Sequence, residues 1–587
     1  TWDYLGSHPH DFSNDDISIE ITSPSDGETV FSSEIQVEFS VSNFTIGAVG
    51  SGADGHIHYQ YEGGDLGMHY STDPIELMDL TEGEYTLGLW LVDDDHQPLD
   101  PNVADTVTFT VSLAFTAIYD IQYVADPDAD DASTLNGQEV MINGVVTAEF
   151  WGSDQYRYMH VQDAEGPWNG IICFEYDGWH EFAWVDDNGS SVPGPAEGDQ
   201  VTLSGIVEEY YNLTELNNIT SGIVHGPADE MISPSVVSVS DIGEAYEGCL
   251  VQVNDVSVDD PDLGNGEWSI TDATNSVRID DKWAYYYWPE AGQELAKVVG
   301  VMDYTDSNYK IQPRLARDVV EADGDPVRIQ RVQQVLYSDL IKAGEDEESD
   351  MSYMAGETVL LEGIVTMPTG LSYAGDGIKF IFEDEHGGPW SGILSYDPDS
   401  SAFGTLLEGF KVQATGFISE YSTGPANLTE LFITQPVQII DPGNDLPPVT
   451  TVLTGDLRWP TEAEQWGTVM VRVEEGIVTD NDLLYEVFAV DDGTGSVLVD
   501  DDSDSIQVYF EEVGPPPVGS LVQSIEGWLY HHYGTNADSS AYKLCPLYVD
   551  DIVFSAGQDL CPPAFLSTDF YDQQVALSWD EPDAANY

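Results

Sequence analysis

The feature that most restricts how this chain can fold is an internal repeat with a period of about 220 residues. Four motifs of the first copy return in the same order in the second: GVVT at 144–147 as GIVT at 363–366, GPWNGI at 166–171 as GPWSGI at 388–393, EG at 197–198 as EG at 408–409, and NLTEL at 212–216 as NLTEL at 427–431. This ordered set of matches indicates duplicated domains rather than a single large core.

A second type of unit follows each copy. Its first strand opens at Gly248 and at Gly467, and two further motifs recur: ITDATNSV at 270–277 as VDDGTGSV at 490–497, and YKIQP at 309–313 as YKLCP at 542–546. We name the first type of unit barrel A and the second barrel B. The predicted order along the chain is therefore A1, B1, A2, B2.

The local pattern predicts strands almost throughout. Short runs of β-branched and aromatic residues alternate with turns rich in Gly, Asp, Asn and Pro, as at 84–92, 201–208 and 469–473. Each repeat unit contains about five such runs in ~100 residues, which is the strand number of an OB-type Greek-key barrel. Helix signals are scarce, and the best helical spacing lies at 332–343.

The repeat from Gly144 to Leu216, with the dipeptide QD at 162–163, resembles the OB-fold domains that accompany secreted bacterial nucleases and many large surface proteins. Upstream, SPSDG at 23–27 is typical of the entry to an extracellular immunoglobulin-like module. VALSW at 575–579 with DEP at 580–582 resembles the opening strand of a fibronectin type III domain. The combination resembles secreted modular proteins of the Bacteroidetes, and this resemblance implies that the natural protein continues beyond Tyr587.

We therefore predict an all-β chain that consists of an immunoglobulin-like sandwich, four tandem OB-like Greek-key barrels and the first strands of a fibronectin type III domain. The predicted divisions are an N-terminal extension at 1–16, the sandwich at 17–113, barrel A1 at 114–235, barrel B1 at 236–324, barrel A2 at 325–445, barrel B2 at 446–560 and the fibronectin start at 561–587.

The charge of the chain restricts its partners. The sequence has 108 Asp and Glu against 15 Lys and Arg, a formal net charge of −93, although 41% of its residues are hydrophobic and can build cores. The charge disfavours nucleic acid and anionic membranes as partners, because both are bound through Lys and Arg, and we predict no nucleic-acid partner. No run of about 18 apolar residues is present, so we predict no membrane insertion. Self-repulsion of this size predicts a saline habitat, bound calcium, or both.

Clustered aspartates are the predicted calcium ligands, because Ca²⁺ takes about six to eight oxygen atoms from carboxylates and carbonyls in loops. The candidates are Asp126, Asp128, Asp130, Asp131, Asp93, Asp95, Asp280, Asp281, Asp500 and Asp501. The run at 126–131 lacks the glycine and the terminal glutamate of an EF-hand. For each cluster the alternative is a solvated acidic surface.

Histidines in the first domain predict a transition-metal site. His56 and His58 alternate along a strand, so both imidazoles point to one face, and His69 and His96 are the candidates to complete the site. Neutral imidazole is a common ligand of zinc and copper. The stretch 55–58, with LWLVDDDH at 89–96, is similar to small bacterial domains that have a Gly-His-His-His strand and a later Asp-His. The alternative is a set of solvated or hydrogen-bonded histidines on the sandwich.

Aromatic residues supply one further candidate surface. The run at 283–288 has no counterpart in barrel B2, where 506–510 stands, and this difference marks the run as a candidate contact surface, with ordinary packing as the alternative. Its predicted binding residues are Trp283, Tyr285, Tyr287 and Trp288.

Four cysteines are present, and none forms a C-x-x-C pair. We expect disulfides between Cys545 and Cys561 and between Cys173 and Cys249, with free buried thiols as the alternative.

No nucleophile elbow, zinc-binding H-E-x-x-H helix or phosphate-binding glycine loop is present, so no catalytic residue is predicted. The first hypothesis is a non-catalytic extracellular protein, such as a stalk, filament or adhesin component, that associates with itself or with other surface proteins or glycans. The alternative is the binding and spacer region of a large secreted hydrolase or nuclease whose catalytic domain lies outside this chain. Both predict an extracellular or cell-surface location, with the signal peptide already removed.

Overall fold

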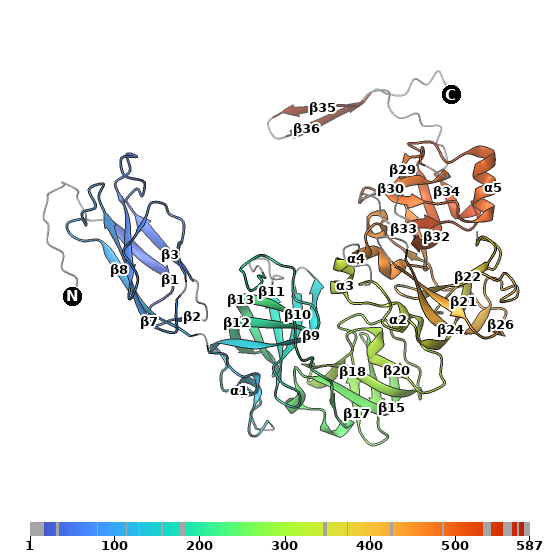
Figure 1. Cartoon of the computed structure of the whole chain (residues 1–587), viewed down its shortest axis with the longest axis horizontal. Coiled ribbons are helices and arrows are strands. Elements are labelled where there is room, and N and C mark those ends of the chain that lie inside the picture. Colours follow the sequence, from blue (N-terminus) through green and yellow to red (C-terminus); the bar gives the residue numbers. More distant parts are fainter. Residues whose placement is uncertain are drawn as a thin grey trace. The chain divides into compact units, whose positions relative to one another are not determined.

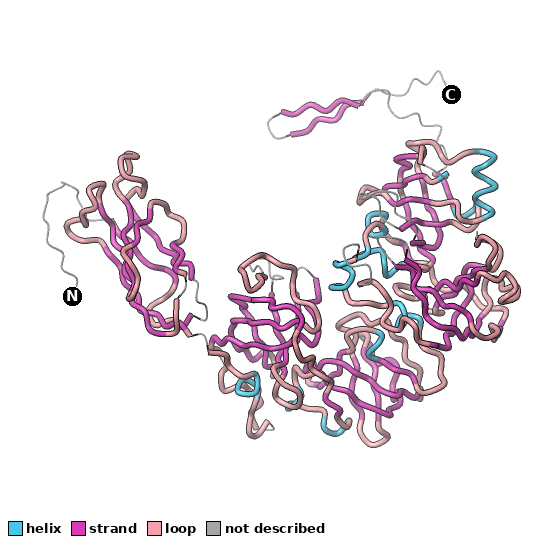
Figure 2. Tube along the Cα trace, in the orientation of Figure 1, coloured by secondary structure: helices cyan, strands magenta, loops and turns pink. Residues whose placement is uncertain are grey.

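The fold is described from a computed structural model (Figure 1). The described residues are 17–30, 35–78, 80–112, 114–127, 129–153, 156–176, 184–343, 349–372, 374–422, 427–483, 486–531, 542–555, 566–571 and 574–579. They divide into two compact units: the first holds most of the chain up to residue 235 together with 243–250 and 302–309, and the second holds the remainder. Strands dominate both units and the helices are short (Figure 2).

The first domain is a sandwich of two β-sheets, with strand orders β1–β3–β6 and β2–β8–β7–β4–β5. The strands are β1 (Ser18–Ser23), β2 (Thr29–Val30), β3 (Ile35–Ser42), β4 (His56–Tyr61), β5 (Gly67–His69), β6 (Ile75–Leu77), β7 (Gly83–Val92) and β8 (Ala104–Val111). Buried residues alternate along β8 because one face of the strand packs against the opposite sheet. The core includes Val37, Ile57, Leu87 and Phe109. The predicted immunoglobulin-like sandwich is confirmed.

Barrel A1 is a closed five-stranded barrel with the order β10–β11–β13–β12–β9. Its elements are α1 (Ile118–Gln122), β9 (Glu139–Ser153), β10 (Tyr156–Gln162), β11 (Gly170–Tyr176), β12 (Asp199–Glu209) and β13 (Thr214–Pro227). The short helix α1 contributes Ile118 and Ile121 to the barrel core, where they pack with Val161, Leu203 and Leu216.

Barrel A2 repeats this arrangement, with β21 pairing to both β22 and β24. Its elements are α2 (Ile329–Gln333), α3 (Tyr337–Lys342), β21 (Thr358–Met367), β22 (Ile378–Glu383), β23 (Gly392–Asp397), β24 (Lys411–Ser422), β25 (Asn427–Ile433) and β26 (Gln438–Asp441). Helix α2 contributes Ile329 and Val332 to the core, as α1 does in barrel A1. The helical pattern predicted at 332–343 is divided between α2 and α3, because the chain is extended at Gln334 and Leu336.

Barrel B1 is formed by a sheet in which β15 also pairs with β18. Its strands are β14 (Ser235–Val236), β15 (Leu250–Gly264), β16 (Glu267–Thr271), β17 (Ser276–Ile279), β18 (Glu294–Thr305), β19 (Asn308–Gln312) and β20 (Val319–Glu321). Its buried residues include Val253, Ile270, Val301 and Ile311.

Barrel B2 has the strand order β27–β28–β32–β33–β31–β30–β29. Its elements are β27 (Thr450–Thr451), α4 (Pro460–Ala463), β28 (Met470–Glu474), β29 (Ile477–Asp480), β30 (Phe488–Asp491), β31 (Val497–Val499), α5 (Asp504–Val513), β32 (Val522–His531), β33 (Tyr542–Cys545) and β34 (Ile552–Phe554). The first long strand is interrupted at Glu475, which has a left-handed φ of 57°, so that β28 and β29 pair with different neighbours. Short 3-10 helices lie at Val239–Asp241, Glu244–Tyr246, Ala316–Asp318, Thr454–Leu457, Glu464–Trp466 and Val549–Asp551.

All four barrels share one topology. The third and fifth strands pair in parallel in each of them, as β11 with β13, β17 with β19, β23 with β25 and β31 with β33. The first strand pairs with the second and the fourth, which closes the barrel and leaves few free sheet edges. This is the arrangement of an OB-type Greek-key barrel, so the predicted fold class is confirmed.

The end of the described chain forms an antiparallel pair of β35 (Leu566–Tyr571) and β36 (Gln574–Trp579). Two strands of this kind agree with the predicted beginning of a fibronectin type III domain. Within the described residues, no helix combines the length and the apolar composition needed to cross a bilayer.

Barrels A2 and B2 pack through a shared apolar cluster. It consists of Met367, Ile381, Leu394 and Leu428 from A2 with Met470, Trp528, Cys545 and Leu547 from B2. The Met470 amide donates to Oε1 of Glu383 (3.1 Å), and the Trp390 amide donates to the Gln465 carbonyl oxygen (2.6 Å). A Cβ atom at Gly392 would collide with the carbonyl oxygen of Thr468, so the close approach requires glycine.

The first unit contains the same junction. The Leu250 amide donates to Oε1 of Gln162 (2.5 Å), and the Trp168 amide donates to the Ala245 carbonyl oxygen (2.6 Å). The repeat therefore preserves the barrels and also the contact between each A barrel and the segment that begins its B barrel.

Cys173 and Cys249 are buried free thiols, so the predicted disulfide between them is wrong. The Cys173 side chain lies in the core of barrel A1, whereas the sulfur of Cys249 lies 3.6 Å from the Gly166 carbonyl oxygen at the junction. Burial raises the pKa of Cys249 to about 12. Cys545 is also a buried free thiol, and its predicted partner Cys561 lies outside the described residues.

Candidate metal centre

Strand β4 carries two of the three residues of the centre. His56 pairs with Val92 and His58 pairs with Trp90 on β7, while Ile57 between them is buried in the sandwich core. Because side chains alternate along a strand, the two histidines share the other face of the sheet. Gly55 precedes them where a Cβ atom would collide with the Val92 carbonyl oxygen, which brings the loop before β4 close to the end of β7.

The third residue, His96, lies in the turn that follows β7. The Asp93 carboxylate accepts hydrogen bonds from the Asp95 and Gln97 amides, both at 2.9 Å, and His96 adopts a left-handed φ of 60°. The Gly50 amide donates to Oδ2 of Asp94 (3.0 Å), which ties the turn to the loop before β4. The acidic run at 93–95 therefore builds the turn that carries His96.

The three imidazoles converge on one point. Nε2 of His56 lies 3.2 Å from Nε2 of His58, and Nδ1 of His96 lies 3.1 Å from each of them. Each nitrogen either carries a proton or presents a lone pair. Two of any three must be in the same state, so at least one of the three pairs cannot be a hydrogen bond. A cation that accepts all three lone pairs removes this conflict.

The geometry of the triangle fits a metal ion. With metal–nitrogen bonds of about 2.05 Å, nitrogens at these separations subtend angles of about 100° at the metal, which is close to tetrahedral. Three protein ligands leave the fourth position open. Within the described residues, this is the group of histidine, cysteine and carboxylate side chains whose ligand atoms lie close enough to share an ion.

The electrostatic surroundings keep two of the ligands neutral. Burial lowers the pKa of His58 to about 4, and burial together with His96 lowers the pKa of His56. Both rings are therefore unprotonated near pH 7, which is the form that binds metals. The Tyr70 ring stacks on His56 at 4.8 Å, and the edge of Trp90 meets His58 at 5.9 Å.

His69 does not join the centre. It pairs with Ile57 across β4 and β5, so its side chain lies on the opposite sheet face from His56 and His58. Its Nε2 instead lies 2.7 Å from the Asp73 carbonyl oxygen and 3.2 Å from Oγ of Ser71.

The predicted calcium clusters of the B barrels have lysine partners. Nζ of Lys310 lies 3.1 Å from Oδ2 of Asp280, and Nζ of Lys543 lies 2.8 Å from Oδ2 of Asp500. The neighbouring carboxyls of Asp281 and Asp501 have raised pKa values, mainly because of burial. In each B barrel, the first aspartate of the predicted calcium pair therefore forms an ion pair with a lysine.

The run at 126–131 is described except for Asp128, which lies outside the described residues. Asp131 accepts hydrogen bonds from Nδ2 of Asn212 at 2.8 and 2.6 Å, and the carboxylate of Asp130 accepts one from the Ala132 amide at 3.3 Å. Calcium binding by Asp126, Asp130 and Asp131 stays a prediction.

The aromatic run at 283–288 is largely internal. Trp283 and Tyr285 are buried, and the Tyr285 hydroxyl accepts a hydrogen bond from Nε1 of Trp268 (2.6 Å). Tyr287 stacks on Trp268 at 5.6 Å and Trp288 stacks on His386 at 4.7 Å. Trp283 and Tyr285 therefore cannot form the expected contact surface, because their side chains are buried.

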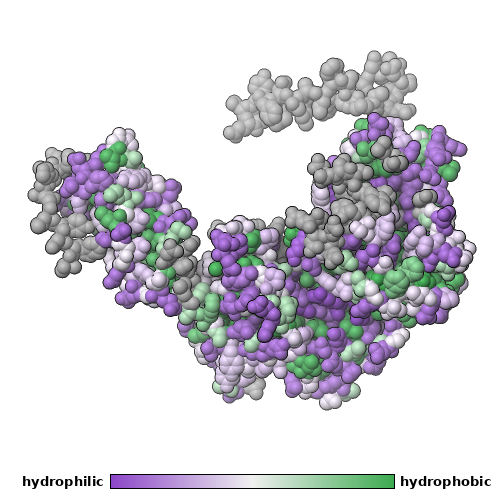
Figure 3. All heavy atoms as spheres, viewed as in Figure 1, coloured by the Kyte–Doolittle hydropathy of each residue, from purple (hydrophilic) through white to green (hydrophobic). Residues whose placement is uncertain are grey.

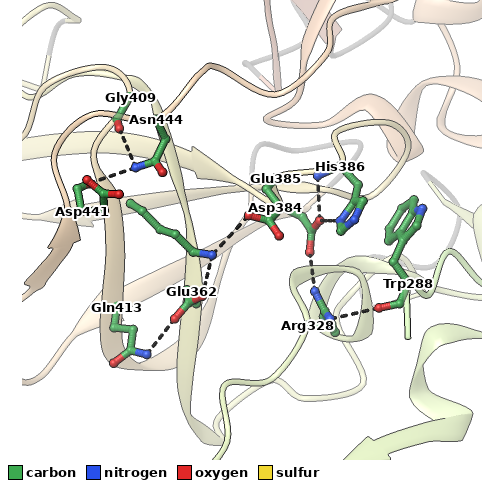
Figure 4. Close-up of polar contacts among 11 residues, drawn as sticks. Trp288, Arg328, Glu362, Asp384, Glu385, His386, Gly409, Gln413, Asp441 and Asn444 are labelled. Carbon is green, nitrogen blue, oxygen red and sulfur yellow. Dashed lines mark hydrogen bonds and ion pairs between the residues drawn. The ribbon is translucent and has the colours of Figure 1, made fainter. Parts of the chain in front are cut away.

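A second polar cluster lies on barrel A2, beside a cleft of about 250 Å³ (Figure 4). Nζ of Lys411 lies 3.0 Å from Glu362 and 3.2 Å from Glu385, and Gln413 donates to Glu362 (2.7 Å). Close by, Arg328 lies 3.3 Å from Oδ2 of Asp384.

The equivalent ladder in barrel A1 is neutral. Gln200 donates to Asn143 (2.8 Å), which donates to Thr202 (2.9 Å). The cluster on A2 is therefore a charged version of a cross-strand hydrogen-bond ladder, in which one lysine contacts two glutamates.

The sequence located His56, His58 and His96 but gave no indication of their surroundings. The role of Asp93 in the turn, and the placement of Tyr70 and Trp90 against the rings, depend on strand register. These surroundings could have been inferred from the sequence only by pairing the strand GHIH at 55–58 with the strand LWLV at 89–92.

No protein-family profile matches the chain, and no curated protein is similar to it. Among solved structures, the fibronectin(III)-like modules of Clostridium thermocellum CbhA match with 11% identity over 37% of this chain and 98% of theirs, at a TM-score of 0.14. A replication protein A heterotrimer bound to ssDNA matches with 10% identity over 72% of this chain and 94% of that chain, at a TM-score of 0.15. The Ifi202 HINa domain in complex with dsDNA matches with 12% identity over 29% of this chain and 90% of that chain, at a TM-score of 0.17. Similarities of this size support no argument about function.

Proposed function

We propose that this chain is a non-catalytic extracellular modular protein whose first domain binds a zinc or copper ion through His56, His58 and His96. The observation that carries the metal-binding part of this proposal is the triangle of ring nitrogens 3.1–3.2 Å apart: no arrangement of protons makes all three pairs hydrogen bonds, whereas one metal ion accepts all three lone pairs.

The four barrels act in this proposal as a spacer. Repeating an A–B pair extends the reach of a protein without adding chemistry, and the junction contacts are the same in both copies. The net charge of −93 favours a salt- or cation-stabilised protein outside the cell and disfavours nucleic acid as a partner. Self-association or contact with other surface proteins or glycans agrees with such a spacer.

A titration with Zn²⁺ and with Cu²⁺ tests the metal centre. We expect the 587-residue chain to bind a single ion of high affinity in calorimetry, and the ion to raise the melting temperature of the first domain because it binds only the folded state. The double variant His56→Ala, His58→Ala removes two of the three ligands and should lose both effects.

The variant His69→Ala is the matched control, because His69 belongs to the same domain but faces away from the centre. It should bind metal like the wild type. Equal binding by the wild type and the double variant would refute the proposed centre.

A further inference from the structure

A methionine on the neighbouring strand lies next to the histidine centre in the sheet register. Met68 on β5 lies directly opposite His58 on β4 in the antiparallel register. Directly opposed residues point to the same sheet face, with Cβ atoms about 4.5–5.5 Å apart. The thioether of Met68 therefore lies on the face that carries His56 and His58.

Tyr70 holds this sulfur beside the centre. Its hydroxyl donates to Sδ of Met68 at 3.3 Å, while its ring stacks on His56 at 4.8 Å with an interplanar angle of 29°. Met68 is 45% exposed and Tyr70 is 40% exposed, so neither serves to fill the core. Tyr70 thus links the Met68 sulfur to His56, and Met68 is the cross-strand neighbour of His58.

The chemistry of the ligand set distinguishes between metals. Zinc sites in proteins use imidazole, thiolate and carboxylate ligands, whereas a thioether is a soft ligand that selects Cu(I). We propose that the centre is a copper site in which Met68 is the fourth ligand and favours Cu(I) over Zn²⁺. This assignment rests on the metal centre proposed above. When copper binds, the Met68 sulfur would give up its hydrogen bond from the Tyr70 hydroxyl and coordinate the metal.

Substitution of Met68 by leucine tests this assignment, because leucine keeps the volume and removes the sulfur. Cu(I) affinity of the full chain is measured by anaerobic competition with bathocuproine disulfonate, and Zn²⁺ affinity by competition with a zinc-binding dye. We expect Met68→Leu to weaken Cu(I) binding by about tenfold or more and to leave Zn²⁺ binding unchanged. X-ray absorption should show a copper–sulfur distance in the wild type that is lost in Met68→Leu.

Met78→Leu is the matched control, because Met78 is 55% exposed in the same domain and lies beyond the end of β6. It should retain wild-type affinity for both metals. Unchanged Cu(I) affinity in Met68→Leu would overturn the role of Met68 while leaving the histidine centre in place. If the wild type bound neither metal, or if the double variant His56→Ala, His58→Ala bound both, the histidine centre would be refuted together with the role of Met68.

Discussion

At the scale of single residues, Glu383 and Gln162 occupy the same position in the two A barrels, but only Glu383 can ionise. Both are buried and both accept an amide hydrogen bond from the first strand of the following B barrel. Burial raises the pKa of Glu383 to about 7, above its ordinary value of 4.5. The folded state therefore holds the proton more tightly than the unfolded chain, and the contribution of Glu383 to stability is lost as pH rises through about 7.

The variant Glu383→Gln reproduces the residue of the first copy and should remove this loss. At about pH 4 we expect the variant and the wild type to have the same free energy of unfolding. At about pH 8 the variant should be more stable by up to about 3 kcal/mol and should melt at a higher temperature. Scanning calorimetry at the two pH values measures the difference. The reverse variant, Gln162→Glu, should lose stability at the higher pH alone, and a gain in Glu383→Gln that is equal at both pH values would contradict the explanation.

At the scale of elements, each B barrel holds a lysine of its fifth strand against an aspartate that follows its third strand. Lys543 on β33 lies 2.8 Å from Asp500, and its side chain is 12% exposed against 11% for the aspartate. Removing one partner of a buried ion pair leaves an uncompensated charge, so Lys543→Met should lower the free energy of unfolding by about 3 kcal/mol. Denaturant unfolding of the full chain measures this loss for the transition that contains barrel B2.

Lys342→Met is the control for this substitution. Lys342 is 54% exposed and lies 3.7 Å from Asp339, so its loss should change stability by less than about 1 kcal/mol. If Asp500 and Asp501 hold calcium instead, added Ca²⁺ should restore the stability of Lys543→Met. Failure of Ca²⁺ to restore it supports a purely ionic pairing with lysine.

The elements that the sequence predicted well are those set by local pattern and by the repeat. The strands of barrels A1 and A2 follow the motifs around Gly144 and Gly363, and the alternation at His56 and His58 correctly placed both rings on one face. Features set by long-range register were not predictable. His69 faces away from the centre because it pairs with Ile57. Cys173 lies in the core of barrel A1 and Cys249 at the junction, and both are free thiols.

At the scale of the whole molecule, the few cations do little to neutralise the surface. Lys310, Lys379 and Arg314 have side chains only 3%, 5% and 8% exposed, and each is paired with a carboxylate. Polar residues predominate on the face drawn in Figure 3, with apolar residues in scattered patches. With 108 acidic residues against 15 Lys and Arg, the exposed charge is predominantly negative. Like charges within a Debye length of about 10 Å at 0.1 M salt repel one another.

This repulsion predicts that dissolved ions stabilise the fold. Raising NaCl from about 0.01 M to about 1 M shortens the Debye length from about 30 Å to about 3 Å, so the melting temperature should rise by several degrees.

Bound calcium predicts a second effect. At the lower salt concentration, a chelator of divalent ions should lower the melting temperature, and micromolar Ca²⁺ should restore it. Scanning calorimetry with NaCl and CaCl₂ at matched ionic strength separates the two effects, because screening depends on ionic strength and a calcium site depends on the ion. A melting temperature that chelation leaves unchanged would remove calcium from the explanation, and one that NaCl does not raise would show that the surface carboxylates repel one another too weakly to matter for folding.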